Sequence, residues 1–218
     1  MTEHEWLASA SPVAMLRYLN ADGGDRKPLL YAAALLASRP ALLTPALKLW
    51  ERAIESVLTG RRSTKALDCI QTATEYESQH LFGPFPPSAR AHYAAIAAAV
   101  FWAWQHADTD YEFGIYHSPV SPEKLEPVRR ANADLVRDIF GNPFRPVSFA
   151  PEWRTDTATA IARQMYESRD FSAMPVLADA LQDAGCDNED VLAHCRDPQQ
   201  VHVRGCWVAD LVLGYECG

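Results

Sequence analysis

Apolar residues recur every three or four positions along most of the chain, and polar residues fill the positions between them. This spacing places apolar side chains on one face of an α-helix. The clearest case follows Thr44-Pro45, where charged residues lie opposite an apolar stripe that ends near Gly60. The stripe consists of Leu47, Trp50, Ile54, Val57 and Leu58. No segment alternates apolar and polar residues over a convincing length, so strands are not expected.

A small polar residue followed by proline marks the start of two more helices, at Ser11-Pro12 and Ser121-Pro122. The polar side chain can cap the first turn, and proline is tolerated at the first helical position. The helix from Pro122 is expected to end at Gly141. Further helices are expected from Asp25, Ser63, Ser88, Thr155 or Asp156, Ser172 and Asp187, and from Val203 to Gly214. The pattern predicts an all-α fold, an irregular bundle of about nine to ten helices with proline-rich connecting loops.

One connecting segment, residues 141–151 (GNPFRPVSFAP), contains three prolines. Proline disfavours helix and restricts the residue before it to extended backbone. We therefore expect a main helical bundle over residues 1–140 and a C-terminal helical segment over residues 141–218. The length of the chain suits a single domain, so the two parts are expected to pack together as one globular unit.

Hydrophobic residues make up 48% of the chain and charged residues 22%, which is typical of a globular protein with a buried core. The net charge of -8 disfavours binding to phosphate backbones, so no nucleic-acid partner is expected. Residues 91–107 contain no Asp, Glu, Lys or Arg. That run is shorter than the roughly 20 residues of a membrane span, so a buried central helix is expected and no membrane partner.

The chain begins with acidic residues where a secretory signal would be basic, and it contains five cysteines, an odd number. These features favour a cytoplasmic location, with free thiols in place of disulfides.

Cysteines and histidines gather near the C-terminus, between residues 186 and 206. Thiolate and imidazole are the ligands that zinc prefers. The candidate metal ligands are Cys186, His194, His202 and Cys206. His202 and Cys206 would lie one turn apart if both were helical. The alternative is that these residues pack in the core: Cys195 follows Val191 at core spacing, and no C-x2-C pair is present. The expectation is no cofactor, with zinc as the alternative.

A second candidate site combines an aromatic loop at residues 108–119 with residues near the C-terminus. Its candidate binding residues are Tyr116, His117, His202, Arg204 and Asp210. They could line a pocket for a small molecule. Alternatively, the loop packs over the central helix, and Arg204 fixes the fold through an ion pair with Asp210, Asp179 or Asp183. The chain has no nucleophile-elbow, phosphate-loop or H-E-x-x-H motif, so no catalytic residue is assigned.

Several segments together resemble an uncharacterised protein family abundant in planctomycete bacteria. They are Glu5-Trp6-Leu7, Pro12-x2-Met15-Leu16, Asp25-Arg26-Lys27, the central RDIFGNPFRPV at residues 137–147, LADAL at 177–181, Ala184-Gly185-Cys186 and HVRGCWVxD at 202–210. The resemblance covers the whole chain and implies no established activity, cofactor or catalytic residue. Family members usually have a basic second helix with cysteine and arginine, where this chain has residues 31–37 (YAAALLA). At the position of Cys195, members of that family can have an apolar residue.

The capping signals and apolar stripes account for most residues of the chain. The first functional hypothesis is therefore a non-enzymatic helical module that binds another protein or serves as an accessory domain. Two alternatives remain open. One is a metal- or thiol-dependent protein that uses the C-terminal cysteines and histidines. The other is a small-molecule enzyme or sensor with a pocket beside residues 108–119.

Overall fold

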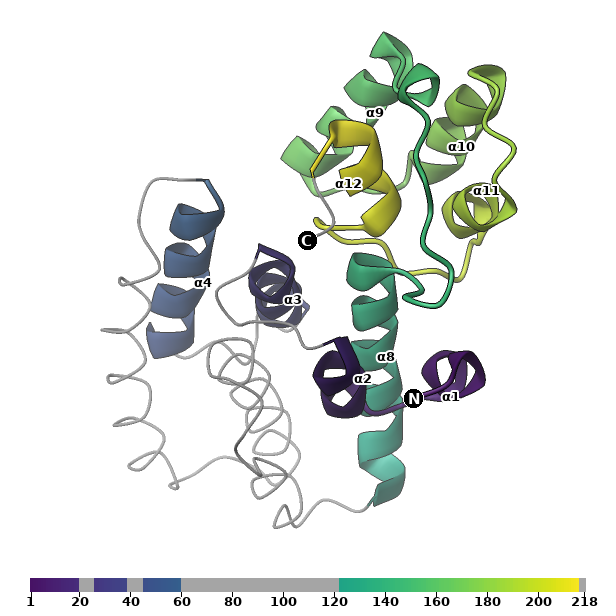
Figure 1. The fold of residues 1–218 in the computed structure, drawn as a ribbon. Coiled ribbons are helices and arrows are strands. Elements are labelled where there is room, and N and C mark those ends of the chain that lie inside the picture. Colours follow the sequence, from purple (N-terminus) through teal and green to yellow (C-terminus); the bar gives the residue numbers. More distant parts are fainter. Residues whose placement is uncertain (20–25, 39–44, 60–121, 216–218) are drawn as a thin grey trace. The chain divides into compact units, whose positions relative to one another are not determined.

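The structure is a computed structural model of the chain, and it describes residues 1–19, 26–38, 45–59 and 122–215. Every regular element in these ranges is a helix, which confirms the predicted all-α fold (Figure 1). The helices are α1 (Glu3–Ala8), α2 (Pro12–Leu19), α3 (Arg26–Ala37), α4 (Pro45–Leu58), α8 (Pro122–Phe140), α9 (Asp156–Ser168), α10 (Met174–Asp183), α11 (Glu189–Arg196) and α12 (Trp207–Leu213), with a short 3-10 helix, η2 (Pro151–Trp153). The predicted helices from Ser63 and Ser88 lie outside the described residues, as does the aromatic loop at 108–119.

None of the described helices combines the length and the apolar character that a membrane span requires. Residues 91–107, the apolar run in the sequence, are not among the described residues.

The chain divides into two compact units, and the division falls inside α8. One unit comprises Met1 and Ala8–Ala133, and the other comprises Thr2–Leu7 and Asp134–Gly218. The second unit thus contains most of α1 together with the last turns of α8. The boundary predicted at residue 141 lies at the end of the same helix.

In the first unit, α3 packs against α4. Most of α3 is buried, including Leu30, Tyr31 and Leu36, because its sequence is apolar on nearly every face. In α4, Ile54 of the predicted apolar stripe is fully buried. The start of α2 is capped as predicted, since Ser11 Oγ accepts a hydrogen bond of 3.3 Å from the amide of Ala14.

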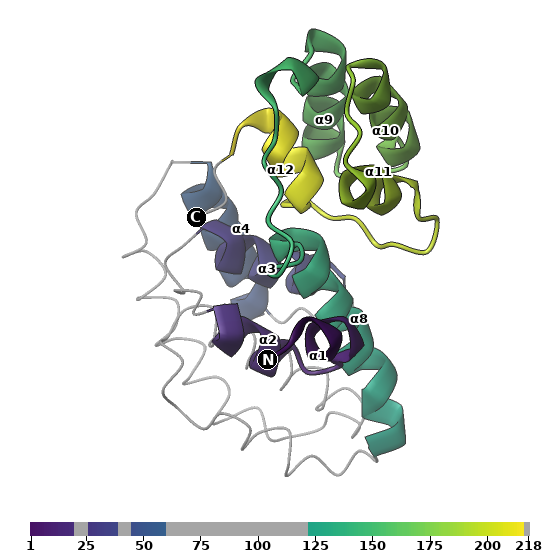
Figure 2. The same cartoon turned by 45° about the vertical axis from the view of Figure 1, so that its right-hand side comes forward.

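In the second unit, α9 to α12 surround one core (Figures 1 and 2). Helix α10 packs against α9 and α11, and α12 packs against the same two helices. The fully buried core side chains include Ala158, Met165, Leu177, Leu181, Val191, Cys195, Cys206, Val208 and Val212. The N-terminal helix joins this unit through polar contacts. Glu3 Oε1 forms an ion pair of 2.6 Å with Arg145, and Arg137 donates to the carbonyl of Trp6.

Three helix starts in the second unit differ from the prediction. Helix α10 begins at Met174 with Ala173 as its N-cap, and not at Ser172. Helix α11 is capped by Asn188, whose side chain accepts from the amide of Val191, and not by Asp187. Helix α12 begins at Trp207, so the predicted start at Val203 is wrong. Gly205 adopts a φ of +102°, outside the helical region, and a tight turn links the amide of Cys206 to the carbonyl of Val203. Cys206 therefore precedes the helix as its N-cap.

Candidate metal centre

The last turn of α8 carries Asp138 into the interior of the second unit. Helix α8 ends at Gly141, which has a φ of +72° and donates to the carbonyl of Arg137. The indole of Trp207 packs against this glycine so closely that an added Cβ would lie 3.2 Å from Trp207 Cγ. Because Trp207 directly follows Cys206, this contact brings the end of α8 to the start of α12.

His194 lies in the last turn of α11 and faces the same point. The buried face of α11, formed by Val191 and Cys195, packs into the core and fixes the rotation of the helix. The His194 ring meets the His202 ring edge-on at a centroid distance of 4.8 Å. It also packs against Trp207 at 5.1 Å. These contacts orient the imidazole toward Asp138 and Cys206.

His202 lies in the segment between α11 and α12, and Asp138 anchors that segment. The amide of Val203 donates to Asp138 Oδ2 over 2.9 Å. The other carboxylate oxygen, Oδ1, lies 3.0 Å from His202 Nδ1. One oxygen of the carboxylate thus holds the backbone, and the second oxygen faces the histidine rings.

Four potential ligand atoms meet at this point, and all lie within 4.8 Å of one another. They belong to Asp138, His194, His202 and Cys206. Asp138 Oδ1 is 3.2 Å from His194 Nε2, which is 3.2 Å from Cys206 Sγ. Cys206 Sγ is 3.8 Å from His202 Nδ1. We call these four residues the Asp-His-His-Cys cluster.

The cluster is shielded from solvent. Asp138 and Cys206 are fully buried, and the side chains of His194 and His202 are 12% and 7% exposed. Burial by itself raises the pKa of Asp138, but hydrogen bonds from His194 and His202 outweigh it and hold that pKa below its usual value. Burial, together with the nearby Asp138 carboxylate, raises the pKa of the Cys206 thiol well above its ordinary value.

The spacing of the four atoms suits a tetrahedral metal ion. Zinc bonds of about 2.0–2.1 Å to nitrogen or oxygen and about 2.3 Å to sulfur imply ligand atoms roughly 3.3–3.6 Å apart. Four of the six distances between these atoms lie between 3.0 and 3.8 Å and bracket that range, and all six lie within 4.8 Å. The charges also match, because a divalent ion would balance one carboxylate and one thiolate in a buried site. These residues could therefore hold a metal ion such as zinc.

The structure brings together three of the four metal ligands that the sequence suggested, namely His194, His202 and Cys206. Cys186 is buried at the end of α10 and is not part of the cluster. The fourth member of the cluster is Asp138, which is not among the ligands predicted from the sequence. One signal was present. Asp138 lies three residues after Leu135, so it shares the apolar face of α8, in a last turn where the helix dipole disfavours a carboxylate.

The residues of the second predicted site separate into different groups. Tyr116 and His117 lie outside the described residues. Asp210 is fully buried and accepts a hydrogen bond from the Tyr166 hydroxyl. The Arg204 guanidinium lies over the Tyr166 ring at 5.6 Å. Arg204 and Asp210 thus share Tyr166 as a neighbour, and only His202 belongs to the cluster.

Comparisons with protein families, with curated proteins and with solved structures found no match for this chain. The resemblance to the planctomycete family stays a prediction. What the chain does is therefore inferred from the chemistry of the cluster and its surroundings.

Proposed function

We propose that the second unit is a zinc-stabilised helical module. We further propose that the protein acts by binding another protein and not by catalysis. One observation carries the zinc part of the proposal: the Asp-His-His-Cys cluster places four ligand atoms within 4.8 Å in a buried site. Four protein ligands fill a tetrahedral zinc ion and leave no position for water or substrate. Such a closed site stabilises a fold, and it does not activate a nucleophile.

The ligands come from separate parts of the second unit. Asp138 ends α8, His194 ends α11, His202 lies in the following segment and Cys206 precedes α12. An ion bound to all four would join these elements at one point. The segment at residues 197–206 contains no helix, so it gains the most order from such a bond.

The alternative of thiol catalysis is less well supported by the same residues. A reactive cysteine needs partial exposure and a lowered pKa. Cys206 is fully buried, and burial raises its pKa. Cys195 is also buried, and burial is the main cause that raises its pKa to about 12. Neither thiol has the environment of a nucleophile.

Metal analysis of the purified full chain tests the proposal. We expect about one zinc ion per chain, lost on dialysis against a strong chelator together with a large fall in melting temperature. Cobalt substitution adds a spectroscopic test, because tetrahedral Co²⁺ with one thiolate gives intense visible absorption and a single-sulfur charge-transfer band. A zinc-free protein that also fails to bind Co²⁺ would contradict the proposal.

Two matched variants distinguish the ligand sets. Cys206→Ser is expected to lose zinc, and Cys186→Ser is expected to retain it, since Cys186 is not in the cluster. Loss of zinc in both variants would instead favour the set of Cys186, His194, His202 and Cys206. Both cysteines are buried, so the two substitutions carry a similar packing cost.

A further inference from the structure

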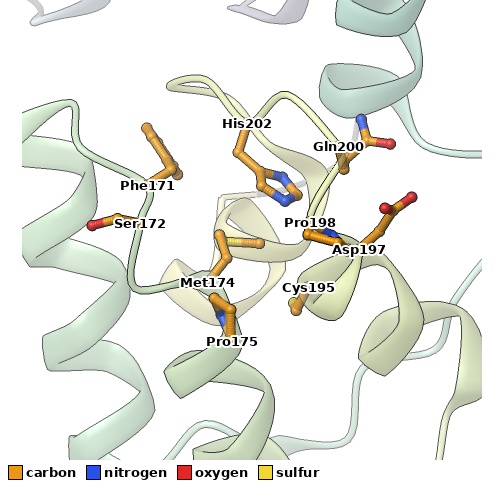
Figure 3. A pocket seen from close by; sticks show the side chains of 9 residues that line it. All are labelled: Phe171, Ser172, Met174, Pro175, Cys195, Asp197, Pro198, Gln200 and His202. Carbon is orange, nitrogen blue, oxygen red and sulfur yellow. The ribbon is translucent and has the colours of Figure 1, made fainter.

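A cavity of about 370 Å³ lies in the second unit, and His202 forms part of its wall (Figure 3). Its lining residues are Phe171, Ser172, Met174, Pro175, Cys195, Asp197, Pro198, Gln200 and His202. The Nδ1 atom of His202 belongs to the Asp-His-His-Cys cluster. The same imidazole therefore connects the cluster to the cavity.

The other ring nitrogen of His202, Nε2, is buried and has no hydrogen-bond partner among the described residues. The side chain is only 7% exposed. In Figure 3 the imidazole points toward the space between Met174, Cys195 and Pro198. A histidine that binds a metal through one nitrogen normally donates its other N–H to an acceptor. Nε2 is therefore available to a hydrogen-bond partner that enters the cavity.

The metal decides which kind of ligand fits. Zinc on Nδ1 leaves the ring proton on Nε2, so His202 presents a hydrogen-bond donor to the cavity. Zinc with one carboxylate and one thiolate has no net charge, so the cluster does not attract an anion. The Asp197 carboxylate on the cavity wall also opposes one. These conditions favour an uncharged acceptor such as a carbonyl oxygen.

The rest of the lining suits a polypeptide. Phe171 and Met174 give the cavity an apolar wall. Val176 and Val201 directly follow two lining residues in the sequence and are 56% and 54% exposed. A partner that covers this surface could bury both valines. A peptide group also offers an N–H to the acceptors of the wall, for which Asp197 is suited.

We propose that this cavity binds an uncharged, extended segment of a partner protein, with one backbone carbonyl on His202 Nε2–H and an aliphatic side chain against Met174. This inference rests on the proposed function, because the bound metal fixes the tautomer of His202. The features of the partner that the cavity recognises are a neutral peptide group and the apolar side chain that follows it.

The test uses the zinc-loaded full chain with ¹⁵N-labelled histidine, and the probe is N-acetyl-leucine N-methylamide. We expect a saturable shift of the His202 Nε2–H resonance at about millimolar probe, as suits so small a ligand. The anion N-acetyl-leucine is expected to bind roughly tenfold more weakly, because Asp197 repels its carboxylate. Equal binding of the two probes would overturn the choice of a neutral ligand.

Two exposed positions provide a matched pair of variants. Ser172→Phe fills the cavity and is expected to abolish the shift, whereas Gln199→Phe lies outside the lining and is expected to leave it unchanged. Zinc content is measured on the same samples. A zinc-loaded protein that shows no saturable shift overturns this inference and leaves the proposed function standing. A protein that binds no zinc overturns both.

Discussion

Nδ1 of His202 lies 3.0 Å from Oδ1 of Asp138, although the two residues belong to elements far apart in the chain. The carboxylate is fully buried, and its second oxygen accepts from the amide of Val203. Asp138 is thus the residue that ties the segment before α12 to the end of α8.

Asp138→Ala should lower the free energy of unfolding of the zinc-loaded protein by about 3–5 kcal/mol, because it removes one ligand and leaves the buried ion without one of its two compensating negative charges. Urea unfolding followed by circular dichroism measures the change. Asp134→Ala is the control on the same helix. Asp134 is 46% exposed and pairs with Arg137, so its loss should cost at most about 1 kcal/mol. Equal effects of the two substitutions would contradict a special role for Asp138.

Gly141→Ala should destabilise the protein more than Gly185→Ala. Both glycines have positive φ, at +72° and +87°, so each substitution carries backbone strain of about 1–2 kcal/mol. Only at Gly141 does the new Cβ also meet Trp207, at 3.2 Å, whereas nothing lies within 4 Å at Gly185. The steric contact should add roughly 1–3 kcal/mol, measured by thermal or urea unfolding. Equal losses of unfolding free energy in the two variants would mean that the Trp207 side chain moves away from the new Cβ without strain.

Zinc affinity should rise with pH. Burial and the neighbouring Asp138 raise the pKa of Cys206 well above its ordinary value, so the metal-free thiol keeps its proton at neutral pH. Zinc binds the thiolate and must displace that proton, which makes binding weaker as pH falls. Each displaced proton should change the affinity by about tenfold per pH unit. Competition titrations with a chromophoric chelator, over about two pH units around neutrality, would measure how steeply the zinc affinity depends on pH. A pH-independent affinity would contradict a thiolate ligand.

Alkylation should spare the buried cysteines of the second unit in the native protein. The thiolate is the reactive form, and burial is the main cause that raises the pKa of Cys195 to about 12. Peptide mapping after iodoacetamide treatment near pH 8 should therefore find Cys195 and Cys206 unmodified. Denaturation in urea should expose both. Rapid native labelling of Cys206 at neutral pH would instead support the thiol-chemistry alternative.

Tyr166→Phe should lower the free energy of unfolding by about 1–3 kcal/mol. The hydroxyl donates a hydrogen bond to the fully buried carboxylate of Asp210, and phenylalanine removes that donor while it keeps the ring. Tyr18→Phe is the control, since Tyr18 is 41% exposed and should change stability by about 0.5 kcal/mol or less. An unchanged midpoint for Tyr166→Phe would show that water or another donor replaces the hydroxyl.

The helices themselves could be read from local sequence. Ser11 caps α2, Thr155 caps α9, and Gly141 ends α8 in the left-handed conformation, as their positions in the sequence predict. These features depend on residues within one or two turns of each other, which is the range over which capping and helical periodicity act. The predicted start of α12 at Val203 is wrong, because the turn at Gly205 interrupts the helical spacing of the apolar residues.

Membership of the Asp-His-His-Cys cluster was decided by tertiary structure. His194, His202 and Cys206 are close in sequence, so residue type alone made them candidates. Asp138 joins them because the contact between Gly141 and Trp207 brings the end of α8 to the start of α12, whereas Cys186 lies outside the cluster. A sequence pattern records periodicity along the chain. It cannot record which helix ends meet, since that depends on packing between residues distant in sequence.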